Sequence, residues 1–279
     1  MKCRSLFLTK IAASAMALAT LCTSFVAPAV AQSAGDVMQA RILPGWRMKD
    51  GTHMAGVELR MVPGWKTYWR APGDAGIPPT FDWRNSVNLV GAQIAWPVPK
   101  RIDQGGMTTI GYSDVVVLPL RLTPDRAGRD IRLRGTLDMG VCKDICIPVT
   151  FNVDAALPSS ATKRDPRIAA ALANRPDTAR EAGVGRVVCT VHPAQDGGLK
   201  LRAEVTLPHR GADEMVVVET SNPAIWVAPT RTTRQGGRLI AQTDLVHVEG
   251  RAFALDRSGL RLTVLSSQGA VDIQGCPAG

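Results

Sequence analysis

The feature that most constrains the fold of this chain is a succession of short runs rich in β-branched and aromatic residues. In the first half the runs cover residues 57–62, 65–69, 87–98, 114–122, 130–141 and 147–153. In the second half they cover residues 184–192, 199–208, 214–220, 225–229, 238–248 and 260–267. Turn-forming residues separate the runs, so they predict β-strands, and their spacing is typical of antiparallel sandwiches. Because the chain is long for one core, we expect an all-β protein with two β-sandwich domains.

One segment between the two sets of runs has a different character. In "LPSSATKRDPRIAAALANRPDTAREAG", Asp165 precedes Pro166 and an alanine-rich run that stops before Pro176. Aspartate is a preferred residue at a helix N-cap, and proline at the first helical position. The segment therefore predicts a short helical linker. We expect the boundaries to be 1–31 for a signal peptide, 32–158 for the first domain, 159–183 for the linker and 184–279 for the second domain.

The amino terminus indicates export. Residues 1–10 carry three basic residues and no acid, a run of small apolar residues follows, and Ala29 and Ala31 form a processing site before Gln32. A membrane anchor is the alternative, but Pro28 and several hydroxyl residues interrupt the apolar run. We expect a secretory signal peptide cleaved near Ala31. No later apolar run is long enough to span a bilayer, so we expect no stable membrane insertion.

The charge of the exported chain argues against nucleic-acid binding. Cleavage after residue 31 would remove three of the 33 basic residues and none of the 24 acidic ones, which leaves a net charge of +6. The basic residues are scattered and are not clustered with aromatic ones. We interpret them as a solvated surface and expect no nucleic-acid partner.

Four cysteines remain in the exported chain: Cys142, Cys146, Cys189 and Cys276. An even number in an oxidising compartment predicts disulfides, and four cysteines allow three pairings. Joining Cys189 to Cys276 would close a loop of about 87 residues and contribute roughly 4.6 kcal/mol, as expected of a structural disulfide. Joining Cys142 to Cys146 would close a loop of about five residues for about 2 kcal/mol. Small, strained and exposed disulfides are more easily reduced, although this pair could also be a simple hairpin clip.

The neighbours of the short pair leave its reactivity open. Lys143 would favour a thiolate at Cys142, whereas Asp144 would oppose it. Pro148 has no amide hydrogen to give to a sheet, which predicts that strand pairing is relaxed just after Cys146.

The motifs of several enzyme classes are missing from the sequence. It contains no Gly-x-Ser-x-Gly elbow, no phosphate-binding glycine-rich loop and no His-x-x-x-His pair. The four histidines are isolated, so each is more typical of a surface or a hydrogen-bonded core than of a metal site. We expect no cofactor and no resident metal, and only the thiols indicate chemistry.

Four stretches carry a resemblance to a known family. They are "GWKTYWRAPGDAGIPPTFDW", "WPVPKR", "GYSDVVVLPL" and "VCKDICIPV", in this order. Residues 45–153 resemble the amino-terminal periplasmic region of the DsbD and ScsB thiol-disulfide interchange proteins, the latter linked to copper tolerance, and residues 185–279 resemble it only in general character. The resemblance implies an immunoglobulin-like fold, a periplasmic location, and a redox-active pair, Cys142 and Cys146.

The resemblance also implies further site residues. In DsbD a cap loop shields the cysteines, and the matching stretch here, "RIDQGGMTTIGYSD", would place Asp103, Gln104 and Met107 over the pair. An aromatic residue on the strand matching "GWKTYW" faces the same site, which points to Tyr68. The resemblance further implies that Cys146 forms the mixed disulfide with partners, whereas Lys143 could instead favour Cys142.

The sequence departs from the family in two ways. The tip of the cap carries two glycines in place of aromatic residues, so we expect looser shielding. The transmembrane region and the thioredoxin-like domain of the full-length family are absent from the chain. We therefore expect a separate membrane-embedded electron donor and periplasmic disulfide-containing proteins as partners.

Three functional classes remain open. The first is a thiol-disulfide oxidoreductase component that acts through mixed disulfides. The second is a Cu(I)-binding or copper-protective module in which the reduced cysteines bind the ion with Met139 or Met107, since soft sulfur ligands select Cu(I). The third is a scaffold with structural disulfides alone. Independently of function, tryptophans at alternate strand positions are typical of a core, so we expect Trp65 or Trp69, or both, to be packing residues.

Overall fold

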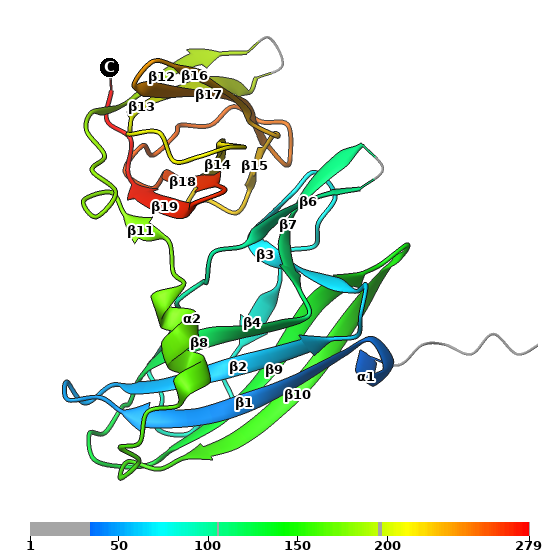
Figure 1. Cartoon of the computed structure of the whole chain (residues 1–279), viewed down its shortest axis with the longest axis vertical. Coiled ribbons are helices and arrows are strands. Elements are labelled where there is room, and N and C mark those ends of the chain that lie inside the picture. The colour runs from blue at the N-terminus through cyan, green and yellow to red at the C-terminus, as the bar shows by residue number, and fades with distance from the viewer. Residues whose placement is uncertain (1–33, 105, 195–196, 279) are drawn as a thin grey trace, which may run out of the picture. The chain divides into compact units, whose positions relative to one another are not determined.

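The computed structural model describes residues 34–104, 106–194 and 197–278 (Figure 1). The predicted signal peptide lies outside these residues. Strands make up most of the described chain, as predicted, and the helices among the described residues are α1 (Ala34–Val37) and α2 (Pro166–Ala173). Neither helix is long and apolar enough to cross a membrane.

The first half of the chain forms two sheets. Sheet A has the strand order β1 (Met38–Arg47), β2 (His53–Met61), β8 (Val115–Thr123) and β5 (Gly91–Ile94). Sheet B has the order β10 (Cys146–Leu157), β9 (Ile131–Cys142), β3 (Lys66–Gly73), β7 (Met107–Ser113) and β6 (Lys100–Gln104), with β4 (Thr80–Asp82) also pairing with β9. All pairings in both sheets are antiparallel.

The second half repeats the two-sheet plan. Sheet C has the order β11 (Asp177–Thr178), β19 (Gly269–Gln274), β18 (Arg261–Ser266) and β14 (Met215–Glu219). Sheet D has the order β12 (Val187–Pro193), β13 (Leu199–Thr206), β17 (Arg238–His247) and β15 (Ile225–Val227), with β16 (Arg231–Gln235) also pairing with β17. The short strand β11 pairs in parallel with β19, and the other pairings are antiparallel.

The core of the first sandwich lies between sheets A and B. Leu118 of β8 and Leu133 and Leu137 of β9 are at most 1% exposed and belong to one apolar cluster. Trp65 and Trp69 join the same cluster, so the prediction that these tryptophans pack in a core is confirmed. Because side chains alternate along a strand, Lys66 and Tyr68 of β3 face the opposite side of sheet B from Trp65 and Trp69.

Strand β1 contains a β-bulge at residues whose sequence is typical of a turn. Pro44 and Gly45 look like a turn, but the strand continues through them and its register against β2 shifts between Leu43 and Trp46. Gly45 has φ +66°, and a Cβ there would lie 1.8 Å from the carbonyl oxygen of Met54. A glycine is therefore required where the bulge brings the two backbones together.

The predicted linker helix is present and is packed against sheet A. The side chain of Asp165 accepts a hydrogen bond from the amide of Arg167 at 2.8 Å, and Pro166 occupies the first turn, so the predicted cap is confirmed. Ile168 is fully buried in an apolar cluster with side chains of β1 and β2. Gly56 of β2 makes room for it, because a Cβ at that position would lie 3.1 Å from Ile168 Cγ1.

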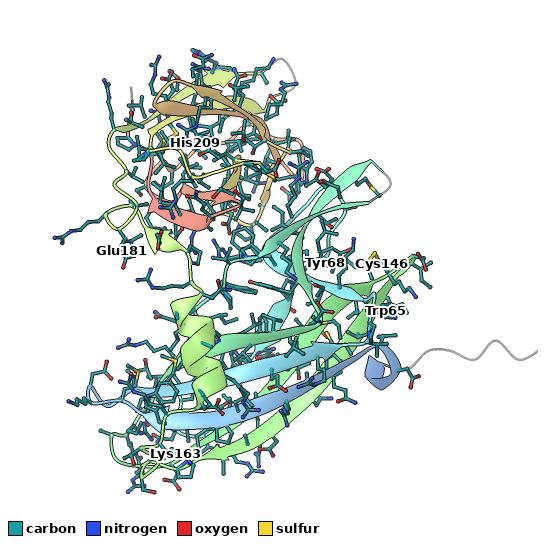
Figure 2. The ribbon with its side chains drawn as sticks, in the orientation of Figure 1. Trp65, Tyr68, Cys146, Lys163, Glu181 and His209 are labelled. Atoms are coloured by element: carbon teal, nitrogen blue, oxygen red, sulfur yellow. A yellow bond between two sulfur atoms is a disulfide. The ribbon has the colours of Figure 1, made fainter. Side chains whose placement is uncertain are left out.

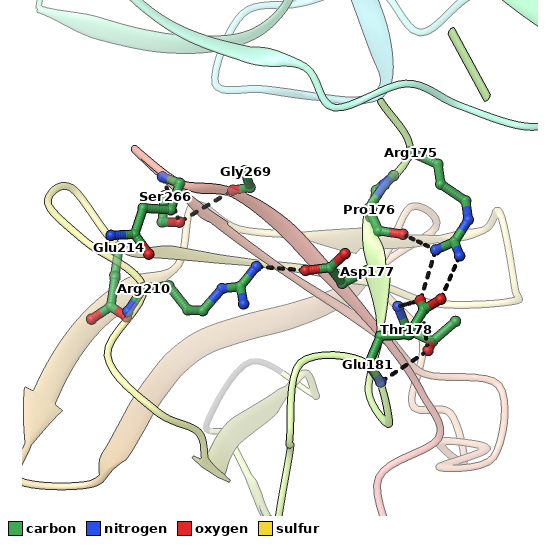
Figure 3. Close-up of polar contacts among 10 residues, drawn as sticks. Arg175, Pro176, Asp177, Thr178, Glu181, Arg210, Glu214, Ser266 and Gly269 are labelled. Carbon is green, nitrogen blue, oxygen red and sulfur yellow. Dashed lines mark hydrogen bonds and ion pairs between the residues drawn. The ribbon is translucent and has the colours of Figure 1, made fainter. Parts of the chain in front are cut away.

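After the helix, polar contacts fix the chain beside the second sandwich (Figure 3). The guanidinium of Arg175 makes two hydrogen bonds to the carboxylate of Glu181, at 2.6 and 2.8 Å, and the amide of Thr178 also donates to that carboxylate. These donors lower the pKa of Glu181 to about 2. Arg210 holds the carboxylate of Asp177 at 2.6 Å, next to the pairing of β11 with β19.

Candidate functional site

The Cys-x-x-x-Cys stretch is the tip of a β-hairpin. Strand β9 ends at Cys142, strand β10 begins at Cys146, and the two cysteines are directly opposite each other in the register. The amide of Lys143 donates to the carbonyl of Ile145 at 3.1 Å and closes the turn between them. The two cysteines form a disulfide across the last pair of the ladder.

The two sulfur-bearing residues differ in accessibility. Cys142 is 2% exposed, whereas Cys146 lies at the surface beside Ile145, which is 65% exposed. A reagent the size of a protein therefore reaches the disulfide from the side of Cys146.

Tyr68 of β3 contacts both sulfurs. Its side chain lies toward the tip of the β9–β10 hairpin (Figure 2), and its hydroxyl is 2.7 Å from Cys142 Sγ and 3.3 Å from Cys146 Sγ. Tyr68 is 2% exposed, and burial raises the pKa of its phenol above the usual value near 10. The phenol therefore keeps its proton at neutral pH and donates it toward sulfur.

Two glycines leave room for the ring of Tyr68. A Cβ at Gly140 of β9 would lie 2.7 Å from Ile77 Cβ and 3.1 Å from Tyr68 Cε2. A Cβ at Gly76 would lie 2.8 Å from Tyr68 Cδ1. The loop after β3 thus covers Tyr68 and brings Ile77, 41% exposed, beside the site. Sequence reasoning did not identify Ile77 or Gly140, because both reach the site through long-range packing.

The predicted cap is a β-hairpin formed by β6 and β7. Gln104 pairs with Met107, residue 105 lies outside the described residues, and Gly106 has φ +81°. The carboxylate of Asp103 accepts hydrogen bonds from other residues of the hairpin, and Met107 is 49% exposed. Among the contacts of the described side chains, those to the sulfurs come from Tyr68. The shielding role of Asp103, Gln104 and Met107 remains a prediction.

The expectation that pairing relaxes after Cys146 is wrong. Strands β9 and β10 pair without interruption from Cys142 and Cys146 to Ile131 and Leu157, and Pro148 lies opposite Gly140 within this ladder. Strand β10 is at the edge of sheet B, where the missing amide of a proline can face away from the neighbouring strand.

The other two cysteines lie in a different environment. Cys189 and Cys276 form a disulfide in the core of the second sandwich and are 0% and 1% exposed. The amide of Cys189 donates to the carbonyl of Pro277 at 2.8 Å, which ties β12 to the end of the described chain. Such complete burial suits a structural cross-link.

Met139 is poorly placed to bind an ion with the short pair. It is 2% exposed and packs in the first core, and because it is three positions from Cys142 on β9 it faces the opposite side of the sheet. The described residues contain no group of three or more histidine, cysteine or acidic side chains that could hold a metal ion.

Comparisons with known proteins find a family model and a solved structure that are similar to this chain. Residues 39–158 match the family model described as "Thiol:disulfide interchange protein DsbD, N-terminal". The crystal structure of the N-terminal periplasmic domain of ScsB from Proteus mirabilis matches with a TM-score of 0.65 and 22% identity, covering 88% of this chain and 95% of that one. A protein of unknown function from Porphyromonas gingivalis W83 aligns at 13% identity over 85% of this chain and 99% of that one, with a TM-score of 0.21. No curated protein matches the chain in sequence.

The likeness to the ScsB domain confirms the predicted immunoglobulin-like β-sandwich fold. The family match spans both sheets of the first sandwich and includes Tyr68, Cys142 and Cys146. Residues 39–158 of this chain carry the amino-terminal domain of DsbD-type thiol:disulfide interchange proteins, and the likeness to the ScsB domain is one of fold.

Proposed function

We propose that this chain is a periplasmic thiol-disulfide interchange protein that passes electrons through Cys142 and Cys146 by forming mixed disulfides with partner proteins. The partners are a separate membrane-embedded electron donor and periplasmic proteins that carry disulfides. Family membership supports the chemistry, and the periplasmic origin of the similar ScsB domain supports the location. The single observation that carries the proposal is the unequal exposure of the two cysteine residues.

Unequal exposure assigns different roles to the two cysteines. A partner thiolate attacks the accessible Cys146 Sγ, the bond between Cys146 and Cys142 breaks, and its electron pair leaves on Cys142 Sγ. The product is a mixed disulfide between the partner and Cys146, with Cys142 as a thiolate.

The second half of the exchange completes the electron balance. A second thiolate of the partner attacks the partner's own sulfur in the mixed disulfide and releases Cys146. The partner dithiol becomes a disulfide, the protein disulfide becomes a dithiol, and two protons pass from the partner thiols to the two cysteines. With a disulfide-bearing partner the same steps run in reverse, and Cys146 is the attacking thiolate.

Tyr68 assists the first step. The thiolate that leaves on Cys142 forms at a buried position, where an unsolvated charge is costly. A phenol hydroxyl 2.7 Å from that sulfur supplies a hydrogen bond that strengthens as negative charge develops.

The test compares single-cysteine variants expressed in the periplasm. With Cys142→Ala, mixed disulfides formed by Cys146 have no resolving thiol in the chain, so reductant-sensitive adducts should accumulate on a non-reducing gel. With Cys146→Ala, the remaining thiol is buried and should trap little. Adducts that accumulate with Cys146→Ala instead would reverse the roles of the two cysteines.

An absence of adducts with both variants would rule out the proposal. In that case a titration of the reduced wild-type protein with Cu(I) would decide between a copper-binding module and a scaffold, because the two free thiols would be the soft ligands.

A further inference from the structure

The segment that packs against Tyr68 follows directly from the pairing of β3 with β7. This pairing sets Tyr68 opposite Gly111, then shifts in register, and resumes at Gly73 opposite Thr109. A register shift of this kind leaves the residues between the two positions out of the ladder and bends the strand. Residues 73–77, which we call the covering loop, then lead back to the ring of Tyr68.

The covering loop and strand β9 hold the ring of Tyr68 at opposite edges. A Cβ at Gly76 of the loop would lie 2.8 Å from Tyr68 Cδ1, and a Cβ at Gly140 of β9 would lie 3.1 Å from Tyr68 Cε2. The ring therefore occupies the space that side chains at these two glycines would need. Because the ring fits between the loop and β9, the position of its hydroxyl depends on where the covering loop lies.

Asp74 fastens the covering loop to β7. Its amide donates to the carbonyl of Thr108 at 3.0 Å, and the amide of Thr108 donates to a carboxylate oxygen of Asp74 at 2.9 Å. We call this reciprocal pair of hydrogen bonds the latch. Gly73 permits the close approach of the two backbones, because its φ is +83° and a Cβ there would lie 2.5 Å from the carbonyl oxygen of Thr108.

Thr108 also connects the latch to the β6–β7 hairpin, the element predicted to be the cap. Its hydroxyl donates to Asp103 Oδ1 at 2.6 Å, and Arg101 Nε donates to the same oxygen at 3.1 Å. Strands β3, β7 and β6 are successive neighbours in sheet B (Figure 1). The loop that packs on Tyr68 is thus anchored to a hairpin 34 positions away in the sequence.

We propose that Asp74 is a positioning residue for the redox pair, which fastens the covering loop to β7 and so keeps the hydroxyl of Tyr68 beside Cys142 Sγ. The inference rests on the proposed function for its biological meaning and deepens it. With the latch closed, the phenol lies 2.7 Å from the sulfur that leaves as a thiolate, where its hydrogen bond strengthens as charge develops. A donor that is already held in place needs no reorientation during the reaction.

The experiment measures the rate at which dithiothreitol reduces the Cys142–Cys146 disulfide in the purified exported chain. Asp74→Ala removes the acceptor of the Thr108 amide, so the loop should leave Tyr68 for part of the time and the rate should fall about threefold. The hydrogen bond from the amide of residue 74 remains, which keeps the effect below that of removing the phenol hydroxyl. Cys146 is already at the surface, so a loosened loop opens no new path to it.

Two single variants accompany Asp74→Ala. In Asp74→Asn the side-chain oxygen can still accept from the amide of Thr108, so the rate should stay near the wild-type value although the charge is lost. Asp130→Ala is the matched control, because Asp130 is also exposed and its carboxylate accepts a hydrogen bond from the distant amide of Ser159 at 2.7 Å. Asp130 precedes β9, whose other end is Cys142, so its loss should leave the rate unchanged.

A double variant separates positioning of the phenol from a general ordering of the loop. If Asp74 acts through Tyr68, adding Asp74→Ala to Tyr68→Phe should change the rate little further, because the hydroxyl to be positioned is already gone. Circular dichroism of each variant checks that the fold is retained. A threefold slowing that persists in the Tyr68→Phe background would overturn the role of Asp74.

Three further results would also overturn it: an unchanged or faster rate with Asp74→Ala, an equally slow rate with Asp74→Asn, or an equal slowing with Asp130→Ala. These rates are properties of the purified protein, whereas the adduct experiment tests partner exchange in cells. Adducts together with unchanged rates would therefore remove the role of Asp74 alone, and slowed rates without adducts would remove the proposed function alone.

Discussion

At the scale of single residues, the site depends on how a negative charge is accommodated at a buried sulfur. Cys142 is almost fully buried, and Tyr68 offers it a hydroxyl that burial keeps protonated. An exposed thiolate would need no such donor, because water would solvate it. The exposed Cys146 and the buried, hydrogen-bonded Cys142 therefore form an ordered pair, in which one sulfur receives the partner and the other accepts the electrons.

Tyr68→Phe tests whether the Tyr68 hydroxyl stabilises the thiolate that forms at Cys142. Hydrogen bonds to charged groups contribute about 1.5–3 kcal/mol, and the bond is only partly developed in the transition state, so we expect the disulfide to be reduced by dithiothreitol about tenfold more slowly. Tyr112→Phe is a suitable control, because it also removes a buried hydroxyl, one that donates to the carbonyl of Pro97 at 2.8 Å. Equal rates for Tyr68→Phe and the wild-type protein would contradict a role for the phenol.

At the scale of secondary-structure elements, much of the fold follows from local sequence. The strands predicted at 114–122 and 130–141 closely match the observed bounds of β8 and β9. The predicted cap residues Asp165 and Pro166 lie at the start of α2. These predictions succeeded because strand periodicity and helix caps depend on neighbouring residues.

Elements that depend on distant contacts were missed. The run at 87–98 forms a strand only over Gly91–Ile94, where β8 offers a partner, and the bulged strand β1 was hidden by Pro44 and Gly45. The cysteines stood out in the sequence and Tyr68 followed from the family resemblance, but the packing of Ile77 beside Gly140 brings together segments far apart in the chain. No local pattern encodes those contacts.

Helix α2 illustrates how a linker becomes part of a domain. Its fully buried Ile168 packs over Gly56, so the helix covers sheet A instead of spanning a gap. Ile168→Ala should lower the free energy of unfolding of the first sandwich by about 2–5 kcal/mol, whereas Ile168→Val should cost about 0.5–1.5 kcal/mol. Urea denaturation followed by tryptophan fluorescence would measure both. A loss below 1 kcal/mol for Ile168→Ala would mean that the helix detaches readily.

At the scale of the whole molecule, the two disulfides differ in accessibility and therefore in reactivity. Limited reduction of the native protein followed by alkylation should label Cys142 and Cys146 well before Cys189 and Cys276, because Cys146 is an exposed residue and both cysteines of the second pair are buried in a core. Mass spectrometry of the labelled peptides measures the order. Simultaneous labelling of all four cysteines would argue against a redox role for the short pair.

The buried disulfide should support stability without taking part in electron transfer. It joins residues 87 positions apart, and the chain-entropy model assigns such a cross-link about 4.6 kcal/mol, as an upper value when the unfolded chain retains structure. The double variant Cys189→Ala/Cys276→Ala should therefore unfold at a lower urea concentration than the wild-type protein. In its folded state, the double variant should still exchange the Cys142–Cys146 disulfide with dithiothreitol at the wild-type rate. Cys189 and Cys276 pack in the second core, whereas Tyr68, which contacts Cys142, is on a sheet of the first sandwich. Removing the buried disulfide should therefore leave the surroundings of Cys142 unchanged. A slower exchange in the folded double variant would instead show that the second sandwich helps to shape the redox site.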